Sequence, residues 1–147
     1  MPRNTDQPIK PADSESSDVT RQRLILVRGA LLHLHKTLLD HERTAYEQRY
    51  GQVAPGELLR LIISDRHFAW LHPVSELIVR IDELLDADPQ AEATDTSSLL
   101  EQTRTLLRSG EADSVFRGRY RTVLQENPDA VLAHADIIRA LDSRRSP

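Results

Sequence analysis

Cysteine is absent from this chain of 147 residues. Its absence excludes disulfides, thiol catalysis, iron–sulfur clusters and cysteine-based zinc sites, and it fits a reducing compartment, so we expect a cytoplasmic protein. Aromatic residues make up only 4% of the sequence and glycine occurs five times, while Leu, Ile, Val and Ala supply most of the apolar residues. Because leucine and alanine favour helices and glycine interrupts them, this composition indicates a mainly helical protein.

Long hydrophobic runs and an excess of positive charge are also missing. The longest apolar run, residues 58–63, is interrupted by Arg60 and is far shorter than the roughly 18 residues of a membrane span. The first residues, MPRNTDQPIKPADSESSD, lack the apolar segment of a signal peptide. The net charge of −4 argues against bulk attraction to nucleic acid or acidic membranes. We therefore expect a soluble protein without a membrane span.

The spacing of apolar residues predicts helices along most of the chain. From Val19 to Tyr50, leucine and valine recur at intervals of three and four, which places them on one helical face. Gly51 follows where a C-terminal cap is expected. Further helical patterns cover residues 55–65, 67–86, 98–110, 111–127 and 128–143. No segment has the pattern of a strand, so the sequence predicts an all-α, single-domain bundle of five or six helices.

Composition also predicts where the folded domain begins and ends. Residues 1–17 are polar, proline-containing and without periodicity, which is typical of a disordered tail. Residues 86–98, DADPQAEATDTSS, are acidic and poor in apolar side chains, so we expect a linker there. The predicted helical bundle covers residues 18–143, and residues 144–147 form a flexible C-terminus.

The segment HFAWLHPVSELIVRIDELLD, residues 67–86, contains the only tryptophan, Trp70, between two histidines, and Pro73 within an apolar stripe. Proline removes a backbone hydrogen bond and clashes with the preceding turn. Either one helix kinks near Pro73, or a turn ends at His72 and a new helix begins with Pro73. The stripe continues across the proline, so both halves face the same core, and we predict one kinked helix.

Phe68, Trp70 and Leu71 place three large apolar side chains within four positions, more than one helical face can bury. Because tryptophan is enriched where partners bind, these residues are the predicted contact of a homodimer or of another protein partner. The alternative is that Trp70 closes the end of the bundle within its own chain.

Six histidines raise the question of a metal or haem site. No glutamate is followed by histidine three residues later, and the His-Glu-x-x-His pattern is absent. His41 and His134 could still point inwards from two helices, and His72 could join them, which would give a site for iron, zinc or haem. The simpler alternative is that each histidine makes one hydrogen bond at the edge of the core, and on that basis we predict no cofactor.

Positive charge gathers in the segment RTLLRSGEADSVFRGRYR, where aromatic residues lie between arginines. Arginine next to aromatic rings can bind phosphates and stack on bases. A helix spreads arginines that are two residues apart around its circumference, so nucleic-acid binding is not the favoured interpretation, and local ion pairs on a solvated face are the default. The candidate anion-binding residues are Arg104, Arg108, Arg117, Arg119 and Arg121.

The stretch FAWLHPVSELIVRIDELL resembles a segment of small bacterial helical proteins without an assigned activity, over residues 21–140. The resemblance implies a bacterial, soluble, helical protein and no particular site. The chain also has no nucleophile-elbow motif and no glycine-rich phosphate loop. The sequence therefore favours a non-enzymatic module that acts through protein–protein contact or regulation, most simply as a homodimer.

Overall fold

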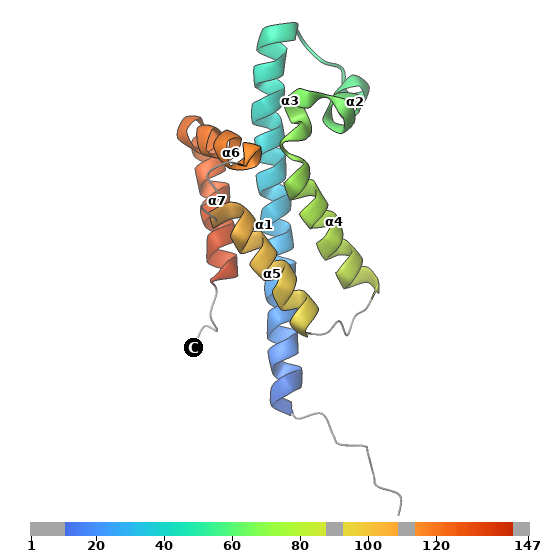
Figure 1. Ribbon diagram of the computed structural model, residues 1–147, viewed down its shortest axis with the longest axis vertical. Coiled ribbons are helices and arrows are strands. Elements are labelled where there is room, and N and C mark those ends of the chain that lie inside the picture. The colour runs from blue at the N-terminus through green and yellow to red at the C-terminus, as the bar shows by residue number, and fades with distance from the viewer. Residues whose placement is uncertain (1–10, 88–92, 109–113, 143–147) are drawn as a thin grey trace, which may run out of the picture.

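A computed structural model describes residues 11–87, 93–108 and 114–142 (Figure 1). This part of the chain is helical and contains no strand, which confirms the predicted all-α class. Its elements are α1 (Pro11–Tyr50), α2 (Pro55–Ser64), α3 (Arg66–Ala69), α4 (His72–Ala87), α5 (Ala93–Arg108), α6 (Val115–Glu126) and α7 (Pro128–Leu141). No helix in these ranges combines the length and apolarity needed to cross a bilayer.

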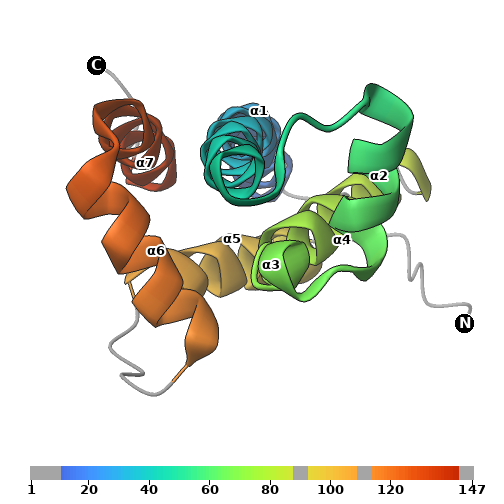
Figure 2. The same ribbon diagram turned by 90° about the horizontal axis from the view of Figure 1, so that it is seen from above.

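Helix α1 is the central element of the fold. It has 40 residues, which corresponds to about 60 Å at the rise of an α-helix. One face of it is completely buried, and this face consists of Leu24, Val27, Leu31, Leu34 and Leu38. Helices α7, α5 and α4 pack along α1, with α7 and α4 on either side and α5 between them (Figure 2). No described helix lies over the remaining side of α1.

The boundaries of the domain differ from those predicted. Helix α1 begins at Pro11, so residues 11–17 belong to the first helix rather than to a tail, as proline is well tolerated in a first helical turn. The predicted linker is shorter, since α4 extends to Ala87 and α5 begins at Ala93, with acidic Asp95 at the positive end of α5. Residues 1–10, 88–92 and 143–147, which include the rest of the predicted tail, linker and C-terminus, lie outside the described residues.

The predicted kink at Pro73 is wrong, because the chain contains two separate helices there. Helix α3 has only four residues, and the side chain of Asp65 accepts a hydrogen bond of 2.8 Å from the backbone N–H of His67 at its start. Pro73 lies in the first turn of α4, where its missing N–H leaves no hydrogen bond unmade. This division gives seven helices in the described residues instead of five or six.

Two helices bury residues that apolar spacing alone does not single out. The buried stripe of α1 continues from Leu38 to Glu42, not to His41, which is only half-buried. In α7 the buried residues are Ala130, Ala133, Ile137 and Leu141. Val131, although larger than these two alanines, is exposed. Because alanine is small, Ala130 and Ala133 let α7 lie close against α1, and this close packing decides which residues of α7 are buried.

Candidate functional site

The three residues predicted to contact a partner are buried within their own chain. Phe68, Trp70 and Leu71 are 0%, 5% and 1% exposed, so they form no free surface, and the prediction that they make a dimer contact is wrong. A turn at Trp70 and Leu71 separates α3 from α4, and all three side chains reach the core. The ring centroid of Trp70 lies 5.7 Å from that of Phe116. Trp70 therefore closes the bundle from inside.

The predicted histidine set is divided among separate contacts. His41 Nδ1 lies 3.2 Å from the side-chain nitrogen of Asn127. The Asn127 oxygen already accepts hydrogen bonds from the first turn of α7, so its N–H donates to His41. His72 Nε2 lies 3.2 Å from the carbonyl oxygen of Ile62. Within the described residues, no three His, Asp or Glu side chains are placed to hold one metal ion. The described structure thus does not bring His41, His72 and His134 together as ligands of one metal ion.

His134 is paired with a buried phenol. The hydroxyl of Tyr120 lies 2.6 Å from His134 Nδ1, and the Tyr120 ring stacks on Phe116 at 5.3 Å. Burial raises the pKa of Tyr120, so the phenol keeps its proton and donates it in this hydrogen bond. Burial lowers the pKa of His134, and Arg108 and Arg117 lower it further. The imidazole is therefore neutral at pH 7, with its proton on Nε2.

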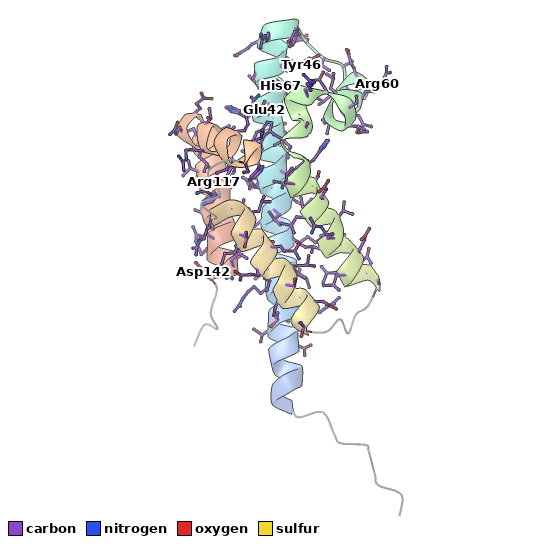
Figure 3. All side chains as sticks on the ribbon, viewed as in Figure 1. Glu42, Tyr46, Arg60, His67, Arg117 and Asp142 are labelled. Carbon is purple, nitrogen blue, oxygen red and sulfur yellow. The ribbon has the colours of Figure 1, made fainter. Side chains whose placement is uncertain are left out.

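The predicted arginine cluster divides into two groups. Arg104 and Arg108 form ion pairs: Arg104 lies 2.8 Å from Glu101, and Arg108 lies 2.8 Å from Asp142 at the end of α7. Arg117 donates to the backbone oxygen of Leu107 at 3.2 Å. Figure 3 shows Arg117 beside α6 and Asp142 at the opposite end of α7. Arg104 and Arg108, the first group, are therefore already paired with carboxylates of the protein.

The second group of arginines borders a small cavity. Arg117, which is half-buried, and Arg121, which is exposed, line it, whereas the exposed Arg119 on the same helix does not. The cavity has a volume of about 150 Å³ and lies between α5, α6 and α7. Its lining residues are Leu107, Arg117, Tyr120, Arg121, Leu124 and His134. The structure thus brings one predicted histidine together with two of the predicted arginines.

A buried pair between α1 and α3 was missed by the sequence analysis. His67 Nε2 lies 2.7 Å from Glu42 Oε2 and 3.1 Å from the Glu42 backbone oxygen. The ring of Tyr46, one turn further along α1, lies 5.6 Å from that of His67 (Figure 3). The spacing of four from Leu38 to Glu42 was the available signal. This spacing makes Glu42 a candidate for burial, as a spacing of three does for His41, and it does not reveal the partner, which comes from another helix.

An exposed face, which we call the α1–α4 face, has no covering helix in the described structure. Its apolar members are Ile25, Leu32 and Val79, which are 47%, 41% and 52% exposed. Gly29 lies among them on α1, and a Cβ built there meets nothing within 4 Å. The α1 part of the face is a stripe with helical spacing that begins at Gln22 and ends at Lys36, both exposed. The exposed acidic residues on α4 are Glu76, Glu83 and Asp86.

Contacts along the seam show that α1 and α4 are antiparallel. Arg21 donates to the backbone oxygen of Leu85, Arg28 pairs with Asp82, and Glu42 pairs with His67 just before α4. Residue numbers thus fall along α4 as they rise along α1. This order places Gly29 and Val79 within about one helical turn of the same height.

Comparisons of the chain with protein-family models, curated proteins and solved structures find no match. The resemblance to small bacterial helical proteins therefore stays a prediction. Functional inference rests on the α1–α4 face and on the cavity next to His134.

Proposed function

We propose that this protein is a non-enzymatic module that acts through protein–protein contact, and that two copies associate through the α1–α4 face. The observation that carries the proposal is Gly29. Glycine in the middle of an exposed helix costs about 1 kcal/mol relative to alanine, and no described part of the chain approaches Gly29 closely enough to require it. A second helix packed across this position would gain from the missing Cβ, because its backbone could come closer.

Charge supports a second copy as the partner. Residues 19–39 of α1 include arginines and a lysine but no acidic residue, whereas α4 has more acidic residues than basic ones. A two-fold axis parallel to the helices would set α1 of one copy against α4 of the other. Because the two helices are antiparallel within each chain, Lys36 would then lie near the second copy's Glu76. The neutral Gln22 would lie near the second copy's Asp86, to which its amide can donate a hydrogen bond.

The size of the face indicates how tight this dimer is. Gln22 and Lys36 are separated by about 21 Å along α1, and two packed helices have axes about 8–10 Å apart. This face is smaller than the roughly 800 Å² per partner of a standard stable interface. We therefore expect a dissociation constant on the order of micromolar.

Gly29→Ala tests the proposal, with Gly118→Ala as the matched control. Gly118 also lies in a helix, is exposed, and meets nothing within 4 Å when a Cβ is added. Both variants should stabilise the monomer against urea by about 0.5–1 kcal/mol. Only Gly29→Ala should weaken the dimer, by about tenfold or more, in sedimentation velocity. Equal dimerisation of the two variants would exclude this face.

A charge exchange tests the orientation of the two copies. Lys36→Glu should weaken the dimer by placing like charges together, and addition of Glu76→Lys in the same chain should restore it. A wild-type protein that sediments as a monomer up to about 1 mM would refute self-association altogether.

A further inference from the structure

We propose that the cavity between α5, α6 and α7 binds a phosphate group. It is distinct from the α1–α4 face, so this second site does not depend on dimerisation. The cavity is lined by two guanidinium groups, from Arg117 and Arg121, and by the imidazole of His134. None of the described residues that line it is acidic.

The hydrogen-bonding groups at this cavity are donors. The Tyr120 hydroxyl lies 2.6 Å from His134 Nδ1 and donates a hydrogen bond to it. This hydrogen bond fixes the His134 tautomer in which Nε2 carries the proton. Arg117 uses one N–H on the backbone oxygen of Leu107, and a guanidinium has five. A phosphate oxygen accepts from groups of this kind, and arginine matches its geometry with two parallel hydrogen bonds.

Charge around the cavity favours an anion, although the whole chain is negative. The carboxylate of Asp142, at the end of α7, is engaged by Arg108 at 2.8 Å and lies 3.7 Å from Arg104. Among the described residues that line the cavity, none supplies a carboxylate to Arg117 or Arg121. Arg104 and Arg108 are paired with carboxylates of the protein, Glu101 and Asp142. A bound anion would do the same for Arg117 and Arg121.

The volume selects the size of the ligand. A cavity of about 150 Å³ is smaller than the roughly 300–1,000 Å³ of pockets that hold a whole drug-sized ligand. A phosphate group, with five heavy atoms, fits this space, and a whole nucleotide does not. The ligand is therefore inorganic phosphate, or a small phosphate ester whose remaining atoms extend out of the cavity.

Protonation of His134 is linked to binding. Burial and the neighbouring Arg108 and Arg117 lower the pKa of His134 in the free protein. A bound phosphate places negative charge beside the ring and raises that pKa, because it favours the charged imidazole. Proton uptake at the His134 ring should therefore accompany phosphate binding, by the same proton linkage.

A titration with inorganic phosphate, followed by calorimetry and by the NMR signals of the His134 ring, tests the proposal. Arg121→Gln should weaken binding about tenfold, since a hydrogen bond to a charged group is lost. Arg119→Gln is the control, because Arg119 is exposed on the same helix but does not line the cavity. It removes the same charge and should change affinity less than twofold. The His134 pKa should rise on saturation of the wild type.

Three results would overturn the site: titration without saturation, equal losses in the two variants, or a His134 pKa that phosphate leaves unchanged. Acetate provides the chemical control, and acetate binding as tight as that of phosphate would also refute a phosphate site. Glycerol phosphate separates the two sources of the ligand. Tighter binding than inorganic phosphate supports a phosphate ester, and equal binding supports the free ion.

Discussion

The hydrogen-bonded pair of Glu42 and His67 ties α3 to the central helix, and its removal gives the sharpest stability prediction. Glu42 Oε2 and His67 Nε2 are 2.7 Å apart, and the two side chains are 7% and 23% exposed. In His67→Ala the carboxylate loses this donor while it remains buried. The cap of α3 is retained, because the side chain of Asp65 accepts from the backbone N–H of residue 67, which alanine keeps.

The expected cost follows from the burial of the pair. A hydrogen bond to a charged group contributes about 1.5–3 kcal/mol. Because His67 is partly solvated, we expect about 2 kcal/mol for His67→Ala, and a similar loss for Glu42→Ala. The double variant leaves neither group unpaired. Its loss should therefore be smaller than the sum of the two single losses by at least about 1 kcal/mol.

Urea unfolding at pH 7, followed by far-UV circular dichroism, measures all four proteins of this cycle. His72→Ala serves as the matched control, because His72 hydrogen-bonds the backbone oxygen of Ile62 rather than Glu42. The combination of His72→Ala with Glu42→Ala should be additive within about 0.5 kcal/mol. A Glu42–His67 cycle that is equally additive would refute the reasoning.

Two further predictions concern pH and the tryptophan. Burial lowers the pKa of His134 and of His35 in the folded chain, so the unfolded state binds more protons than the folded state below its own histidine pKa of about 6.5. The free energy of unfolding should thus be highest above pH 6.5 and fall with decreasing pH, by at most about 1.4 kcal/mol per pH unit for each histidine, and by less because both are partly solvated. His134→Gln should flatten this profile in urea titrations, and an unchanged profile would contradict the assignment. Trp70, buried by its own chain, should show a fluorescence maximum to the blue of the unfolded protein that dilution does not move; a red shift on dilution would mean that a partner covers it.

Local chemistry made several helix ends predictable. Gly51 has a φ of +91°, as its expected place after α1 required. Asn127 caps α7 with its side chain, and proline follows it at the first helical position. Both are determined by neighbours within a few residues, so the sequence contains all the information needed.

Packing was harder to predict, because it depends on partners distant in the chain. At the end of the α1 stripe, His41 and Glu42 are adjacent, and periodicity alone does not decide which one turns inwards. The donor His67, 25 positions away, stabilises Glu42 in the buried place. Similarly, the apolar pattern does not reveal that the helix is interrupted before Pro73, since the apolar stripe continues on both sides of the interruption. The break is what places Trp70 in the core.

The position of α1 in the chain has a consequence for synthesis. Its 40 residues exceed the ~12–15 at which an isolated helix becomes marginally stable, so α1 can form as soon as it leaves the ribosome. The helices that cover Leu24 to Leu38 follow later, with α7 last of those described. Translation proceeds at about 5–20 residues per second. The apolar stripe of α1 is therefore synthesised on the order of ten seconds before the last described helix that packs on it. During that interval a nascent chain presents to chaperones a hydrophobic surface that the finished protein hides.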